Sequence, residues 1–251
     1  MIDECSTMSP QFVFRSAGRT HRGVVRKNNE DAILALDAPK LWAVCDGLGG
    51  HAKGEIASAF IMEMLSLNAA HDPAQSRQQE IGEILRDANL ELCRRNVAEA
   101  PQNAMGSTVA ALAVDGGEFF CWWAGDSRIY RLRSNSFTAL THDHRYVQAL
   151  LDAGELSEAE AASHPQRNVV TRAMGIEPAL TIDRSQGTVE IDDIFVLITD
   201  GISAVLSDDE IAQTIRAEDL EPAADRIVNL CLQRGAPDNL SLVLVRASAA
   251  D

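Results

Sequence analysis

The sequence predicts a layered α+β sandwich, and the spacing of its strands is the first reason. Apolar runs typical of strands follow one another at 108–114, 118–124 and 128–133, with links of only a few residues. Links this short join antiparallel neighbours, so we expect these three strands to pair in order. Helical patterns come in pairs between groups of strands, which disfavours a doubly wound parallel sheet.

The N-terminal third predicts three strands followed by two helices. The strands are expected at 12–18, 32–36 and 41–45. Their short connections favour antiparallel pairing within this group. Apolar residues then recur at helical spacing over 56–67 and 77–99, and Pro101 should end this helical region.

The C-terminal half mixes a loop-rich segment, short strands and two capped helices. Residues 141–175 are expected to be helical and loop-rich, with a capping box at Ser157–Glu160. Ser207 should cap one later helix, and Gly235 should end another that covers 221–233. Further strands are expected at 180–182, 194–199 and 240–245.

The composition indicates a globular chain with an acidic surface. Its 251 residues contain no Pro-, Gly- or Ser-rich linker, so we expect one domain over 11–248, preceded by a flexible tail at 1–10. The 22 basic and 37 acidic residues give a net charge of −15. Such a charge argues against nucleic acid or an anionic membrane as a partner.

The sequence shows neither a membrane span nor a secretion signal. No apolar run reaches the roughly 18 residues that a span needs, and no basic start precedes an apolar core at the N-terminus. The five cysteines are odd in number and lack a Cys-x-x-Cys pair, which is typical of reduced thiols. We therefore expect a cytoplasmic protein.

Acidic residues at strand ends are the main functional signal. The four are Asp46, Asp126, Asp200 and Asp238. Asp46 and Asp200 each follow an apolar run and precede a glycine. A single Asp-Gly is usually a turn. Four such acids, far apart in the sequence, indicate a shared cation, because like charges converge only where a cation holds them.

Short motifs around these acids occur in a recognisable order. They are Arg26-Lys27-Asn28-Asn29-Glu30-Asp31, Asp46-Gly47-Leu48-Gly49-Gly50-His51, Gly106-Ser107-Thr108, Gly125-Asp126-Ser127-Arg128, Asp200-Gly201 and Pro237-Asp238-Asn239. From about Gly18 to Val245 the chain resembles the metal-dependent Ser/Thr protein phosphatases of the PPM (type 2C) family, in their compact bacterial form. The resemblance implies a four-layer αββα sandwich of two antiparallel sheets, with a flap at 141–178.

The resemblance also implies which residues hold metal ions. Asp46 would bridge two ions, and the carbonyl of Gly47 would bind one of them. Asp200 and Asp238 would hold the other ion. Asp126 would form, together with Asp200, a weaker third site.

The resemblance also implies the roles of the other site residues and the identity of the metal. Glu30 and Asp31 would act mostly through coordinated waters. Arg26 would bind the substrate phosphate with its planar fork of donors, and catalysis would depend on Asp46, Asp200 and Arg26. Oxygen ligands imply Mn²⁺ or Mg²⁺ in place of zinc. We expect hydrolysis of phosphoserine and phosphothreonine by a metal-activated water at this binuclear centre.

Other readings of the sequence are weaker. A cysteine-dependent phosphatase has five residues between its Cys and Arg, whereas six separate Cys121 and Arg128. A zinc hydrolase could use His142 and His144, but no further cluster of His or Cys completes a zinc site. The non-enzymatic alternative is a pseudophosphatase, or a phosphoprotein-binding adaptor on the same fold. The presence of all the principal acids disfavours it.

The resemblance implies phosphorylated proteins as partners. These would be a Ser/Thr kinase and its substrates, such as forkhead-associated proteins, and the segments 41–44 and 234–239 suggest a link to type VI secretion. We expect a monomer that binds neither nucleic acid nor membrane.

Eukaryotic members of the family commonly carry a His where this chain has Leu48, and that His is proposed as the general acid. In this chain a metal-bound water or His51 would then be the general acid.

Overall fold

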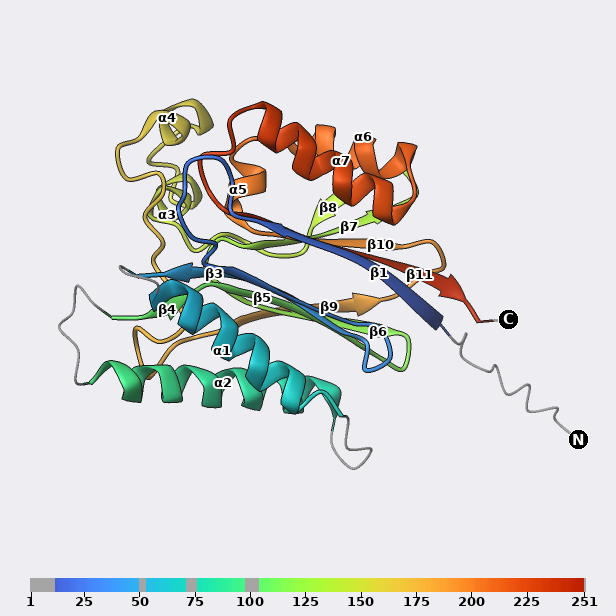
Figure 1. The fold of residues 1–251 in the computed structure, drawn as a ribbon, viewed down its shortest axis with the longest axis horizontal. Helices are drawn as coiled ribbons and strands as arrows, with labels where there is room; N and C mark the ends of the chain where they lie inside the picture. The colour runs from blue at the N-terminus through green and yellow to red at the C-terminus, as the bar shows by residue number, and fades with distance from the viewer. Residues whose placement is uncertain (1–11, 50–52, 71–75, 98–103, 251) are drawn as a thin grey trace, which may run out of the picture.

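Two stacked β-sheets form the centre of the molecule (Figure 1). The computed structural model describes residues 12–49, 53–70, 76–97 and 104–250. One sheet contains β1 (Phe12–His21), β7 (Arg128–Arg133), β8 (Ser136–Ala139), β10 (Ile194–Ile198) and β11 (Leu240–Ala249). The other contains β2 (Asp31–Leu36), β3 (Leu41–Leu48), β4 (Gly106–Ser107), β5 (Val109–Asp115), β6 (Glu118–Ala124) and β9 (Asp183–Thr188).

The strand order places sequence-distant strands side by side. The five-stranded sheet runs β1-β11-β10-β7-β8, and the six-stranded sheet runs β2-β3-β5-β6-β9 with β4 beside β3. Neighbouring strands are antiparallel in both sheets. β1 and β11 pair along ten residues each, from Phe12 opposite Ala249 to His21 opposite Leu240.

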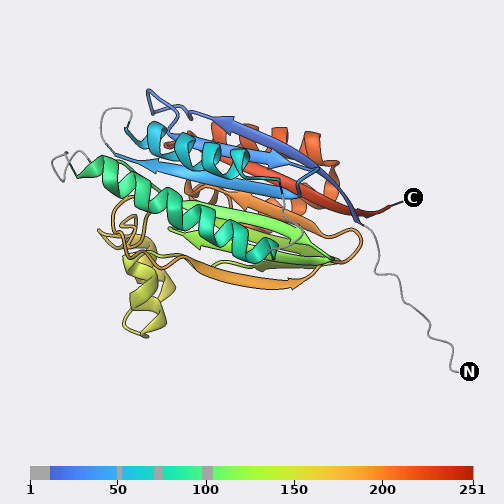
Figure 2. The ribbon, with the colours of Figure 1, turned by 90° about the horizontal axis from the view of Figure 1, so that it is seen from below.

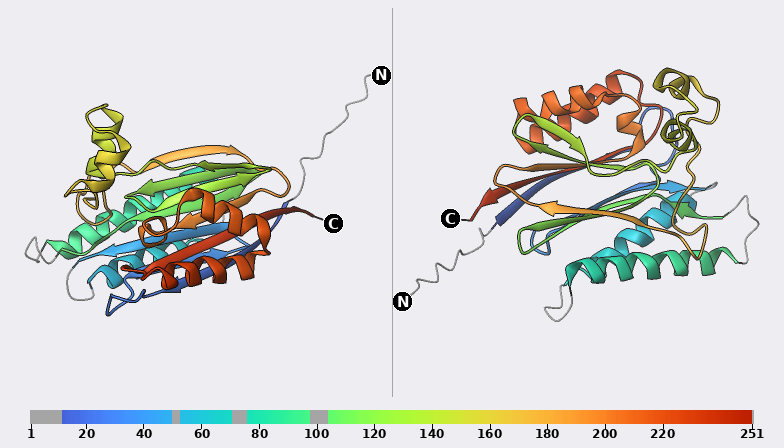
Figure 3. Two further views of the ribbon diagram at one scale, coloured as in Figure 1. Left: turned by 90° about the horizontal axis from the view of Figure 1, so that it is seen from above. Right: turned by 180° about the vertical axis from the view of Figure 1, so that it is seen from behind.

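Helices cover both outer faces. α1 (Lys53–Leu67) and α2 (Arg77–Asn96) lie across the six-stranded sheet (Figure 2). α5 (Asp200–Ser203), α6 (Asp208–Ala217) and α7 (Leu220–Gln233) lie on the five-stranded sheet. α3 (Tyr146–Asp152) and α4 (Glu158–Ser163) stand at one end of the sandwich (Figure 3). The predicted four-layer αββα architecture is confirmed.

Three apolar cores hold these layers together. The core between the sheets contains large side chains such as Trp42, Phe119 and Phe195. Each outer core joins a sheet to its helices. A strand such as β3 is therefore buried on both faces, which explains why 41–45 is a continuous apolar run instead of an alternating one. Among the helices that the structure describes, none is both long and apolar enough to cross a membrane.

The prediction that three consecutive strands pair in order was half wrong. β5 and β6 do pair, but β6 lies in one sheet and β7 in the other. The link Gly125–Ser127 steps between the layers, and Gly125 has φ +114°. A Cβ on Gly125 would lie 2.5 Å from the Thr108 side chain, so this crossing requires glycine.

Other predictions about strands and helices had mixed outcomes. β2 and β3 pair as expected, whereas β1 joins the other sheet. The strand expected at 180–182 is wrong, since Leu180 and Ile182 pack against an outer core and the strand is β9. The polar strand β8 was not foreseen. Both capping boxes, at Ser157 and Ser207, are confirmed. Residues 1–10, His51 and Pro101 lie outside the described residues.

Candidate metal centre

One end of the sandwich gathers the strand-end acids. Asp31 opens β2 and lies opposite Asp46 in β3. Asp200 begins α5 just after β10, and Asp238 lies shortly before β11. Because β10 and β11 are antiparallel neighbours, the end of β10 meets the start of β11. Acids from both sheets therefore lie at the same end of the molecule.

Two connections bring the sheets together at this end. Thr199, the residue after β10, donates a hydrogen bond from Oγ1 to Oδ2 of Asp31 over 2.8 Å. Asp126 occupies the link between the sheets and is only 3% exposed. Asp31 is 9% exposed. The predicted site residues thus meet where the two sheets meet, and two of them are almost removed from water.

The backbone of Asp46 is fixed by the neighbouring strand segment. The Asp46 amide donates to Oγ1 of Thr108 over 2.9 Å, and the Thr108 amide donates to the Asp46 carbonyl over 2.8 Å. Ser107 Oγ donates to the same carbonyl over 2.9 Å. Ser107 and Thr108 therefore support the end of β3 that carries Asp46.

Gly47 allows three segments to meet behind Asp46. Its amide donates to the carbonyl of Glu30 over 3.1 Å. A Cβ at this position would lie 2.2 Å from the carbonyl oxygen of Gly54 and 2.5 Å from that of Glu30. Only a glycine fits between the Glu30 loop and the start of α1. Leu48 follows, opposite Gly106.

Asn239 holds the loop that carries Arg26 and Glu30. Its Oδ1 accepts from the Glu30 amide over 2.8 Å. Its Nδ2 donates to the carbonyls of Arg22 and Asn28, each over 2.9 Å. Its own amide donates to Oδ1 of Asp238 over 2.9 Å. One amide side chain next to a predicted ligand therefore shapes the N-terminal side of the site.

The clustered carboxylates resist ionisation. Burial, and then the charges of Asp31, Asp200, Asp126 and Asp238, raise the pKa of Asp46 well above its ordinary value. Burial is also the largest cause that raises the pKa of Asp31 and of Asp126, each to about 7. Burial and the charge of Asp238 raise the pKa of Asp200. Carboxylates that oppose one another in this way form a site for cations.

The charge count of this cluster is unbalanced. Five of the six predicted carboxylates, all except Asp126, belong to the part of the cluster around Asp46: Glu30, Asp31, Asp46, Asp200 and Asp238. Arg26 bonds one of them, donating to Oδ2 of Asp238 over 2.6 Å, and the charge of Arg145 also acts on Asp200 from the side of Asp126. When all five carboxylates are ionised, their charge exceeds that of Arg26 by four, which two divalent ions would cancel.

The donor set fits Mn²⁺ or Mg²⁺, although it is not a finished cage. Within the described ranges, no group of three His, Cys, Asp or Glu side chains is already arranged to hold an ion. These two metals favour oxygen ligands and keep several waters, so they need few direct protein ligands. The side chains that the described part of the chain gathers here are mainly carboxylates, and burial raises the pKa of the neighbouring Cys45 thiol. The residues therefore fit hard divalent cations better than zinc.

Within the described ranges, the histidines and cysteines do not form a rival site. His142 contacts Asp152 through Nε2 over 2.7 Å, whereas Nε2 of His144 contacts Asp183 over 3.1 Å. The two rings have separate partners, which contradicts a zinc pair. Burial raises the pKa of the Cys121 thiol to about 12, which is the opposite of an activated nucleophile.

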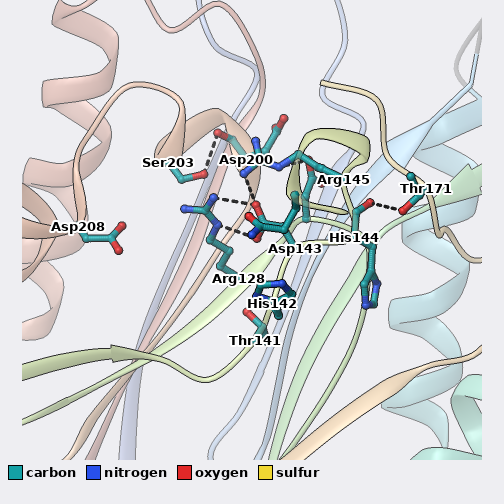
Figure 4. A network of polar contacts seen from close by, with 12 residues as sticks. Arg128, Thr141, His142, Asp143, His144, Arg145, Thr171, Asp200, Ser203 and Asp208 are labelled. Carbon is teal, nitrogen blue, oxygen red and sulfur yellow. Dashed lines mark hydrogen bonds and ion pairs between the residues drawn. The ribbon is translucent and has the colours of Figure 1, made fainter. Parts of the chain in front are cut away.

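A polar network next to Asp126 was largely missed by sequence reasoning (Figure 4). Arg128 donates from Nε and a terminal nitrogen to the two oxygens of Asp143, over 2.8 and 2.7 Å. Arg128 is therefore an ion-pair partner of Asp143. Arg145 contacts the same Asp143 carboxylate and lies near Asp126. Thr199 was also missed, although its place just before Asp200 was a usable signal.

Comparison with known proteins identifies the family. The model of the family described as protein phosphatase 2C matches residues 17–245. The chain belongs to this family. The Ser/Thr protein phosphatase PstP of Mycobacterium tuberculosis is 34% identical over 236 residues, covering 93% of this chain and 45% of PstP. The Ser/Thr phosphatase stp of Listeria welshimeri is 30% identical over 235 residues, covering 90% of this chain and 93% of stp.

Solved structures of the phosphatase 2C family share the fold. The catalytic domain of PstP in complex with two manganese ions has a TM-score of 0.86 and 31% identity, covering 95% of this chain and 100% of that one. PppA, described as a key regulatory component of the type VI secretion system in Pseudomonas aeruginosa, has a TM-score of 0.82 and 37% identity, covering 94% and 100%. The chain spans about half the length of full PstP.

Proposed function

We propose that this chain removes phosphate from phosphoserine and phosphothreonine in proteins, with two Mn²⁺ or Mg²⁺ ions as cofactors. The observation that carries the proposal is the cluster of four unbalanced negative charges where the sheets meet. Membership of the phosphatase 2C family and the two manganese ions of the PstP catalytic domain support it.

The proposed ligands follow the geometry of the cluster. Asp46, the carbonyl of Gly47, Asp200 and Asp238 would hold the two ions, as the family resemblance implies. Two such ions, when bound, lower the pKa of a water and neutralise charge on phosphoryl oxygens. Thr199 holds Asp31 through one oxygen, and Asp31 would act through coordinated waters, as the family resemblance implies.

Arg26 is placed to bind the substrate phosphate. Its side chain is 53% exposed at the mouth of the cluster, and one of its terminal nitrogens bonds Asp238. The rest of its fork remains for a phosphate oxygen. A guanidinium that is shared between a ligand and the substrate would align the phosphate with the metal cluster.

A pseudophosphatase is not favoured. Loss of catalysis on this fold would be expected to relax the costly burial of like charges, yet Asp31, Asp46 and Asp200 all remain, with raised pKa values. Burial of unmatched carboxylates is destabilising unless a cation is bound.

The substrates are proposed from relatives and from chemistry. We propose a Ser/Thr kinase and its targets, including forkhead-associated proteins, as cytoplasmic substrates. The 37% identity with PppA supports a role in type VI secretion.

The test is hydrolysis of a phosphothreonine peptide and of p-nitrophenyl phosphate by the chelator-treated protein, with and without added Mn²⁺. We expect activity only with metal, and almost none in Asp200→Asn. Asp209→Asn, which changes an exposed acid of α6, is the matched control. Equal activity after metal removal would refute the proposed mechanism.

A further inference from the structure

We propose that Arg145 is a built-in cation for Asp126, which takes the place of a third metal ion and limits this chain to two. The inference rests on the proposed metal-dependent function. It concerns the outer end of the same acid cluster, where family resemblance led us to expect a weaker third ion.

The Arg145 side chain lies against Asp126 without being saturated by other partners. Its Nε is 3.9 Å from Oδ2 of Asp126. Among the described residues, this Nε is one of the few buried side-chain nitrogens with no hydrogen-bond partner. A terminal nitrogen of the same guanidinium contacts Asp143. One cation therefore lies between two buried carboxylates.

The backbone on both sides of Arg145 is fixed, so the side chain is positioned. The His144 amide donates to the Gly125 carbonyl over 2.9 Å, directly beside Asp126. The Tyr146 amide donates to the Val169 carbonyl over 2.9 Å, and Arg145 itself forms a β-bridge with Val170. The guanidinium is thus held at the base of the flap and at the link between the sheets.

The charges at this end are already matched. When both are ionised, Asp126 and Asp143 carry two negative charges, and Arg128 and Arg145 carry two positive charges, with Arg128 bonded to both oxygens of Asp143. A divalent ion on Asp126 would add two positive charges beside a guanidinium that is anchored in place. Repulsion between the ion and the guanidinium would weaken the binding of that ion. The two inner ions would instead face four unmatched negative charges.

The experiment counts bound Mn²⁺ by equilibrium dialysis with elemental analysis, at metal concentrations up to the millimolar range. The variants are Arg145→Ser, Arg145→Gln and Arg145→Ser/Asp126→Asn. Arg172→Ser is the nearby control, because it removes an arginine that bonds Asp183 at the start of β9 and contacts His144, the residue before Arg145. Thermal unfolding checks that each variant is folded. Two different substitutions at Arg145 are made so that the test still works if one of them does not fold.

We expect two ions in the wild type and in Arg172→Ser, three in Arg145→Ser or Arg145→Gln, and two again in the double variant. Three ions in the wild type, or two in every folded Arg145 variant, would overturn the inference. Binding of no Mn²⁺ by the wild type would overturn the proposed function itself, so the two failures are distinguishable.

Discussion

The two ends of the acid cluster solve the same electrostatic problem in different ways. Around Asp46, five carboxylates meet one exposed arginine, and the imbalance is left for dissolved ions. Around Asp126, two carboxylates meet two arginines that belong to the chain. We propose that the first end needs metal ions and that the second is balanced by its own arginines.

This difference separates catalysis from folding. A site that must bind and release ions keeps buried like charges, which destabilise the metal-free protein. A buried network of paired charges is destabilising only when one member is removed. Substitutions at the Asp46 end should therefore reduce activity, and substitutions at the Asp126 end should reduce stability.

The largest effect is expected from Asp46→Asn. Loss of the proposed bridging carboxylate should lower kcat for a phosphothreonine peptide by about 10³-fold or more. Asp126→Asn should lower kcat by only about 10-fold, because Asp126 is proposed to pair with Arg145 and not to bind an ion that catalysis requires. Steady-state kinetics at saturating Mn²⁺ compares the two, and equal losses would remove the distinction between the ends.

Arg128→Met tests the opposite end. It leaves the buried Asp143 with one arginine instead of two, so the free energy of unfolding should fall by about 3 kcal/mol. Arg19→Met breaks contacts to the exposed Asp225 and Glu221, and should cost about 1 kcal/mol or less. Urea unfolding measures both. A smaller loss in Arg128→Met than in Arg19→Met would contradict the assignment.

Arg26→Ala tests the single arginine of the metal end. The loss of charged hydrogen bonds to the phosphate should lower kcat/KM by about 10–100-fold. Arg26→Lys should recover only part of this, since an ammonium cannot bind two oxygens as a fork does. Unchanged kcat/KM in Arg26→Ala would exclude a phosphate contact.

The pH dependence of stability gives a smaller but directional test. Because burial raises the pKa of Asp31 to about 7, folded chains hold a proton that unfolded chains release, between the ordinary carboxyl pKa and about 7. The metal-free protein should thus lose stability as pH rises through that window. Asp31→Asn should make the melting temperature less dependent on pH, although Asp46, Asp126 and Asp200 still contribute, and saturating Mn²⁺ should also reduce the dependence. A wild-type slope that neither change alters would exclude Asp31 as its source.

Local signals allowed much of the site to be predicted from the sequence. Asp46 and Asp200 could be predicted because an apolar run that ends at Asp-Gly indicates the end of a strand. This signal does not depend on which strands are its neighbours. The layered fold followed from short links and paired helices. These are properties of short segments, which a sequence records directly.

The features that were missed depend on distant contacts. The change of sheet at Gly125–Ser127 has the length of an ordinary hairpin link, and only packing against Thr108 shows that it crosses between layers. Arg145 is one arginine among many in the sequence. Its place beside Asp126 arises from bonds that join 144–146 to 169–171, which no periodic pattern reveals.

The hydrogen bonds from Asn239 to the Glu30 loop have a consequence for how the chain folds during synthesis. Its bond to the Glu30 amide joins residues 209 positions apart, and β1 cannot pair until β11 exists. During translation, which proceeds at about 5–20 residues per second, the N-terminal acids wait many seconds for Asp238 and Asn239 to emerge. Until residues 238–249 have emerged, the growing chain therefore lacks part of the proposed metal centre.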